Sequence, residues 1–260
     1  MRLVVAAPIA ALVGALVAGA ALLAAPAPKT RTDTVMPAAS PSTTAGVPLD
    51  GVHGEHPPPP SVPVGAVAAG YGASRSGPGG VPLGFARTSD GAAAAATAWL
   101  ATVEGSGILD TTRRTAVLGA IGDPDFVAGA TARLADRAAA LGLSAVGRPA
   151  TGRVTATVWA DRGAYRVVSY GPVAARVEIW HLYQVGVVPP GAQPGPGQWR
   201  RAQAAVRWDI AANDWRLSSD LTFVDGPDPQ VAVPSRLERA AMLARLGEGQ
   251  GWLLYANSTY

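Results

Sequence analysis

The chain has 260 residues, three histidines, no cysteine and a formal net charge of +3. The lack of cysteine excludes disulfide bonds, cysteine zinc sites, thiol nucleophiles and cysteine-linked lipid anchors. Residues 81–260 contain 17 arginines, no lysine and 15 acidic residues, so this part of the chain is almost neutral. Because these arginines are scattered rather than clustered, we expect no direct binding of nucleic acid.

The chain begins with an apolar run, residues 3–25, that contains no charged side chain. As a helix it would be roughly 34 Å long, against about 30 Å of bilayer hydrocarbon. The sequence therefore predicts a transmembrane anchor within residues 1–25, with the membrane bilayer as its partner. The alternative is a cleaved signal peptide that starts with the charge of Arg2. Cleavage after Ala25 or Ala27 would leave proline next, which disfavours the alternative.

Residues 26–80 are rich in proline, glycine, alanine and serine, with four consecutive prolines at 57–60. Such a segment cannot bury enough apolar surface to fold, so we expect a disordered linker with an average reach of roughly 40 Å. A spacer of this kind suits a single-pass protein of the cell membrane whose C-terminal domain is extracytoplasmic. His53 and His56 lie in this linker, where no third ligand or supporting shell is expected, so we predict no metal site.

Residues 81–260 are predicted to form one domain that starts with helices. Thr88, Ser89 and Asp90 offer capping oxygens to a helix over 91–103, and a second helix is expected over 110–120. Asp123 followed by proline starts a third helix that runs to Leu141. Helical spacing turns one set of its side chains inward: Phe126, Val127, Leu134 and Leu141. The same spacing turns another set to solvent: Arg133, Asp136 and Arg137.

After residue 152 the apolar period changes from near four to two, which indicates strands. The expected order is a strand at 154–158, a turn at 161–163, strands at 165–170, 177–187 and 202–208, a turn at 213–214, an alternating segment from 215 to 223, a helix at 234–246 and a tail at 251–255. Helices that precede consecutive antiparallel strands indicate the α+β class. We expect helices packed on a curved antiparallel sheet, in a cone-shaped α+β roll.

His181 is the only histidine after residue 80, and it lies on an apolar strand face between Ile179 and Tyr183. One interpretation is a packed histidine with a single hydrogen bond. The other is a general base in the cone. Its companions would then come from four side chains: Asp209, Asp220, Tyr165 and Tyr183. Because the sequence fixes no distance between these groups and His181, we favour the packed histidine. We expect no catalytic, cofactor-binding or metal-binding residue.

Five of the seven tryptophans fall into two groups. Trp180, Trp208 and Trp215 fall on predicted strands, where core packing is the expected role. Trp199 follows the proline- and glycine-rich connection and Trp252 lies in the tail, so these two are candidates for exposed contact residues.

Several segments after residue 80 carry a family resemblance: VPLGFART at 81–88, DGA at 90–92, VEIW at 177–180, RW at 207–208, NDWRL at 213–217, and GW at 251–252 with Tyr255. Together they resemble single-anchor membrane proteins of actinobacterial integrative and conjugative elements. These proteins are similar in architecture to the bitopic assembly-factor subunit of type IV secretion systems, whose outer domain is a nuclear-transport-factor-two-like roll. The resemblance covers most of residues 81–260 in the order of its motifs. This chain departs from the bitopic pattern in having almost no predicted cytoplasmic tail.

The resemblance implies a non-enzymatic structural or assembly subunit of an envelope complex, in conjugative DNA-transfer machinery that is similar to type IV secretion. Its partners would be other envelope or secretion-complex proteins, or a second copy of the chain. The alternative is an extracytoplasmic roll that binds a small ligand or catalyses a reaction in the cone around His181.

Overall fold

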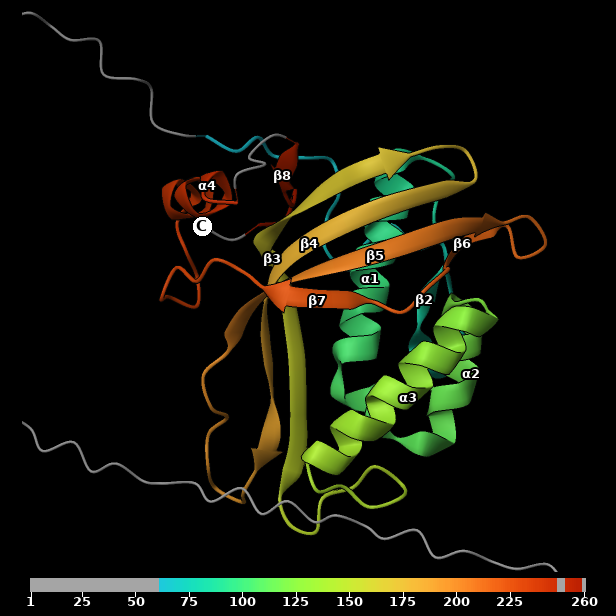
Figure 1. Ribbon diagram of the computed structural model, residues 1–260, viewed down its shortest axis with the longest axis vertical. Coiled ribbons are helices and arrows are strands. Elements are labelled where there is room, and N and C mark those ends of the chain that lie inside the picture. Colours follow the sequence, from blue (N-terminus) through green and yellow to red (C-terminus); the bar gives the residue numbers. More distant parts are fainter. Residues whose placement is uncertain (1–60, 247–250, 259–260) are drawn as a thin grey trace, which may run out of the picture. The chain divides into compact units, whose positions relative to one another are not determined.

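The computed structural model describes residues 61–246 and 251–258. The predicted anchor, residues 1–25, and the predicted linker up to residue 60 lie outside the described residues. No helix in the described part is long and apolar enough to cross a membrane. The described chain has an α+β architecture, with helices packed on an antiparallel sheet, and confirms the predicted class (Figure 1).

Each α-helix in the described part of the chain begins at a side chain that caps its first turn. The four helices are α1 (Ser89–Glu104), α2 (Thr111–Ile121), α3 (Pro124–Ala140) and α4 (Arg236–Ala244). Their caps are Thr88, Asp110, Asp123 and Ser235, each accepting a backbone N–H of the helix that follows. Two short 3-10 helices, η1 (Pro78–Gly80) and η2 (Ser106–Leu109), flank α1. The three helices predicted before the sheet are confirmed.

The main sheet has six antiparallel strands in the order β6-β5-β4-β3-β8, with β7 also paired to β5. Its strands are β3 (Arg153–Tyr170), β4 (Ala174–Val188), β5 (Gln198–Asp209), β6 (Asp214–Leu217), β7 (Thr222–Asp225) and β8 (Trp252–Leu254). A separate pair joins β1 (Arg75–Ser76) to β2 (Pro82–Leu83). The strands β3, β4 and β5 follow one another in space as in sequence, as a meander requires.

The turn predicted at 161–163 is wrong, because β3 continues through these residues to Tyr170. The pairing of β3 with β4 shifts register between Trp159 and Ala164, which is an irregularity of the β-bulge kind. At Gly163 an added Cβ would lie 1.8 Å from the Trp180 carbonyl oxygen. The glycine therefore allows two backbones to approach closely inside the sheet rather than reversing the chain.

Successive side chains of a strand point to opposite sides, and the middle of β4, from Val177 to Tyr183, is buried on both faces. On one face, α1 lies against β3, β4 and β5, and its Trp99, Leu100 and Val103 pack in the same core as Ile179 (Figure 1). On the other face, Trp180 packs in a second core that contains α4 side chains.

Trp199 and Trp252 belong to this second core, so the interpretation of either as an exposed contact residue is wrong. Both side chains are buried, and the rings of Trp180 and Trp199 stack with their centroids 4.4 Å apart. Both residues belong to strands of the main sheet, because Trp199 pairs with Leu182 of β4 and Trp252 pairs with Arg166 of β3. This is a tertiary contact, which the local composition around each tryptophan does not encode.

Residues 61–80 were predicted as linker, but the structure packs them on the domain. Val62 and Val67 are buried. The Gly65 N–H donates to the Leu254 carbonyl at 2.8 Å, and the Leu254 N–H donates to the Pro63 carbonyl at 2.9 Å. The folded domain therefore begins no later than residue 61, because this proline- and glycine-containing segment pairs with the tail of the chain.

The buried carboxylate of Asp214 holds the segment that leads into α1 against the sheet. Its oxygens accept the backbone N–H groups of Gly84 at 2.5 Å, Phe85 at 3.0 Å and Trp215 at 2.9 Å. We predict that Asp214→Ala lowers the free energy of unfolding by about 3 kcal/mol, because buried donors lose a charged acceptor. Urea unfolding of the wild type, Asp214→Ala and Asp214→Asn measures this. Asn keeps one acceptor oxygen, so its loss should be smaller, and equal stability of all three would contradict the prediction.

Candidate functional site

A buried carboxylate at the end of α1 joins three elements of the domain. Glu104 is the last residue of α1, and only 3% of its surface is exposed. Its Oε1 lies 2.7 Å from Arg133 Nη1, and its Oε2 lies 3.5 Å from Arg137 Nη1 and 3.6 Å from Arg200 Nη1. Two of these arginines come from α3 and the third from β5. One negative charge therefore ties α1, α3 and the sheet together.

The three guanidinium groups alternate with two aromatic rings. Arg137 lies 5.4 Å and Arg200 lies 4.9 Å from the centroid of the Tyr183 ring. Arg200 lies 4.5 Å and Arg133 lies 5.4 Å from the centroid of the Phe223 ring. We call these five residues the arginine stack. Each contact is within the range of a cation–π interaction, and Arg200 is in contact with both rings.

Arg133 and Arg137 were predicted to face solvent, and this is wrong. Their side chains are 24% and 13% exposed, and both reach back to the end of α1. Arg137 Nη2 donates to the Glu104 carbonyl oxygen at 2.9 Å, which satisfies one of the free carbonyl groups at the C-terminus of α1. Arg133 Nε also lies 3.0 Å from the Asp220 carboxylate. The spacing of four puts both arginines on one face of α3, but only the neighbouring elements decide what that face meets.

An open pocket of about 440 Å³ lies over the arginine stack. The stack and Glu104 line it on one side. The remaining lining residues come from α3 and its end and from three strands: Ala140, Leu141, Val185, Gln198 and Asp225. The pocket thus combines cationic, acidic, aromatic and aliphatic groups within a volume that is common for small-ligand sites.

The phenol of Tyr183 stays neutral in this pocket. Burial raises the pKa of Tyr183 above its ordinary value of 10.0, and the nearby negative charge of Glu104 raises it further. The positive charges of Arg137 and Arg200 act in the opposite direction but are the smaller causes. At neutral pH the Tyr183 side chain is therefore a hydroxyl group that can donate a hydrogen bond, not a phenolate base.

His181 is fully buried next to the stack, on the same face of β4 as Tyr183 and opposite Arg200 in the strand register. Its Nδ1 lies 3.2 Å from the Ile179 carbonyl oxygen, and its Nε2 has no hydrogen-bond partner among the described residues. Burial lowers the pKa of His181 to about 4, and the positive charge of Arg200 also lowers it. The side chain is therefore a packed, neutral imidazole at physiological pH.

The structure does not bring the proposed companions of His181 into hydrogen bonds with it. Tyr183 belongs to the arginine stack, and Asp220 pairs with Arg133. Asp209 lies 2.7 Å from Arg216 at the far end of β5. The Tyr165 hydroxyl accepts the Val67 N–H at 3.4 Å and its ring packs on Tyr255. These placements agree with the packed histidine that we favoured.

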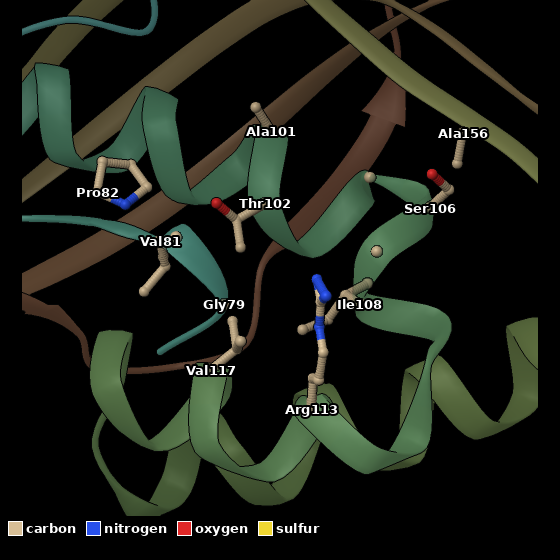
Figure 2. A pocket seen from close by; sticks show the side chains of 13 residues that line it. Gly79, Val81, Pro82, Ala101, Thr102, Ser106, Ile108, Arg113, Val117 and Ala156 are labelled. Atoms are coloured by element: carbon tan, nitrogen blue, oxygen red, sulfur yellow. The ribbon is translucent and has the colours of Figure 1, made fainter. Parts of the chain in front are cut away.

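A second pocket, of about 330 Å³, lies between η1, the end of α1, η2 and α2. Figure 2 shows the Arg113 side chain extending from α2 into it, with Thr102 and Ser106 on the α1 side. Gly79 and Gly80 form part of its wall in left-handed conformations, with φ values of 67° and 80°. This pocket offers a single charged side chain among its lining residues, so it is a weaker candidate than the arginine stack.

Comparison with known proteins adds no relative: no family model, curated protein or solved structure matches this chain. Within residues 61–246 and 251–258, no group of three or more histidine and acidic side chains is placed to hold a metal ion. His53 and His56 lie outside these ranges. The candidate site is therefore defined by its own geometry alone.

Removal of the Glu104 carboxylate tests whether the stack depends on it. We predict that Glu104→Ala lowers the free energy of unfolding by about 3 kcal/mol, because three partly buried arginines lose their shared anion. Urea unfolding measures the loss, with the exposed Asp136→Ala of α3 as a control that should change stability by less than about 0.5 kcal/mol. A double-mutant cycle with Arg133→Ala should give a favourable coupling. A loss below about 1 kcal/mol for Glu104→Ala would contradict this role.

The buried imidazole predicts a pH dependence of stability. Its pKa falls from 6.5 to about 4 on folding, so the unfolded chain binds the proton first as the pH drops. The contribution of His181 is present above pH 7 and is lost as the pH falls toward 4. Between pH 7 and pH 5 we expect the wild type to lose about 2 kcal/mol more than His181→Gln. Parallel urea unfolding curves at the two pH values measure this, and equal losses in both proteins would contradict it.

Proposed function

We propose that the chain is a membrane-anchored structural or assembly subunit of an envelope complex, in conjugative DNA-transfer machinery similar to type IV secretion. It would act through protein–protein contacts, with its C-terminal domain outside the cytoplasm and one anchor in the bilayer. The apolar run at 3–25 and the motif resemblance after residue 80 support this proposal. We further propose that the sheet and α1 form the cone-shaped roll of the nuclear-transport-factor-two type.

The observation that carries the proposal is an apolar surface at one end of the sheet. The turns β3–β4 and β5–β6 lie next to each other there, since the Trp208 N–H donates to the Val173 carbonyl at 2.9 Å. Tyr170, Val173 and Ile210 are 43%, 56% and 81% exposed. We call these three residues with Trp208 the turn patch. Grouped exposed apolar side chains are typical of surfaces that contact another protein.

The packing inside the domain also favours a contact role over chemistry in the cone. Trp99, Leu100 and Val103 of α1 have no exposed surface and occupy the side of the sheet that carries His181. Solvent therefore does not reach the imidazole in this arrangement. A protein that uses its outer surface, rather than its interior, fits this distribution of side chains. Its partners would be other envelope or secretion-complex proteins, or a second copy of the chain.

Deletion of the gene should depress DNA transfer, counted as recipients that acquire DNA per donor cell. Restoring the chain with Val173→Asp and Ile210→Asp should leave transfer at least about tenfold lower, because two apolar side chains would no longer be buried against the proposed partner. The matched control is Leu237→Asp, which changes an exposed leucine on α4 that is not part of the turn patch. Protein levels in the membrane fraction must be equal in all strains. Normal transfer after deletion would refute the proposed function.

A photo-reactive amino acid at position 210 tests the contact directly. We expect it to cross-link to a component of the secretion channel or to a second copy of the chain, whereas the same group at position 237 should not. Protease added outside intact cells should degrade the domain if it is extracytoplasmic. Cross-linking from 237 but not from 210 would place the contact elsewhere and contradict the role of the turn patch.

A further inference from the structure

We propose that the pocket over the arginine stack binds a small anionic ligand, a carboxylate with a flat apolar body, and that Arg200 is the residue that holds the carboxylate. This inference goes beyond the proposed function and does not rest on it. It follows from the unused hydrogen-bond donors of Arg200, from the distribution of charge around it and from the lining of the pocket.

Arg200 is held with its hydrogen-bond donors unused. The centroids of the Tyr183 and Phe223 rings lie 4.9 Å and 4.5 Å from its guanidinium carbon. The guanidinium carries five N–H donors in a fork that matches a carboxylate. Arg200 donates no hydrogen bond among the described residues, and its one carboxylate contact, to Glu104, is 3.6 Å long. Its side chain remains 25% exposed toward the pocket.

Arg133, not Arg200, makes the short contacts to the carboxylates of the site. Arg133 takes the short contact to Glu104, at 2.7 Å, and also pairs with Asp220 at 3.0 Å. Arg137 and Arg200 share the other oxygen of Glu104, at 3.5 Å and 3.6 Å. An added anion would therefore satisfy donors that the chain itself leaves open.

Two acidic residues line the pocket: Glu104, which is already paired with arginines, and Asp225, which opposes this attraction. Asp225 is opposite Arg200 in the pairing of β5 with β7, and it lines the pocket. It is exposed to solvent, and no ion pair joins it to Arg200. Its charge is therefore screened by water but still lowers the affinity for an anion. Removing this charge should raise that affinity.

The shape and the apolar lining select the kind of anion. The pocket has a volume of about 440 Å³, within the usual range for small-molecule sites. Leu141, Val185 and the Phe223 ring supply apolar surface beside the cationic edge. A planar carboxylate matches the edge of a guanidinium by two parallel hydrogen bonds, and a flat body can pack on the ring. Aromatic carboxylates have both properties.

Benzoate is the probe that tests this inference, with the neutral and similarly shaped benzamide as its control. The full-length chain, labelled with ¹⁵N and held in detergent micelles, is titrated while the arginine Nε–Hε signals are followed by NMR. We expect benzoate to shift the Arg200 and Arg137 signals in a saturable way, and benzamide to bind at least about tenfold more weakly, since it lacks the charge. The affinity for benzoate should fall as the salt concentration rises.

Variants assign the binding to the pocket. Arg200→Gln should weaken benzoate binding at least about tenfold, and Val185→Trp, which fills the mouth without touching a charge, should do the same. Asp225→Asn should strengthen binding about threefold, because it removes a like charge near the ligand. The matched control is Arg207→Gln, a more exposed arginine on the same strand, which should not change binding.

Thermal unfolding of each variant shows whether it is folded. The proposal is overturned if benzoate does not bind, if benzamide binds equally well, or if Arg200→Gln and Val185→Trp leave the benzoate affinity unchanged. The DNA-transfer experiment reports separately on the turn patch.

Discussion

The buried charge of Glu104 is the constraint on which this domain depends. A carboxylate removed from water must be paired, and Glu104 meets this requirement with arginines from α3 and β5. The same contacts set the position of α3 against α1, because Arg137 also binds the last carbonyl of α1. The rings of Tyr183 and Phe223 then fill the spaces between the guanidinium groups. One set of side chains thus packs the space between α1, α3 and the sheet, caps the end of α1 and pairs the buried charge of Glu104.

The sheet separates two environments with different chemistry. The side that faces α1 ends in the arginine stack and its open pocket, with the neutral His181 sealed behind it. The opposite side holds the tryptophan core under α4, together with a second buried ion pair, Arg166 to Glu178, at 2.5 Å.

The proposed contact surface and the proposed ligand pocket use different parts of the sheet. The turn patch is formed by the β3–β4 and β5–β6 turns, whereas the pocket is lined by the opposite portions of β4 and β5. Residues 61–69 reach the domain at a third place, beside β8 and the tail. The turn patch and the pocket therefore share no residue. Under both proposals a ligand can be bound with or without a protein partner on the turn patch.

Local signals in the sequence determined the helices and most strands, because an N-cap or an alternating pattern is satisfied within a few residues. Thr88 and Asp123 cap their helices as their positions predict. Contacts between distant residues were decided only by the tertiary structure. Gly163 lies in a bulge rather than a turn because of Trp180, and Trp252 is buried because the tail returns to β3. Arg133 faces Glu104 and not solvent for the same reason, since a helical period gives the direction of a side chain but not what lies in that direction.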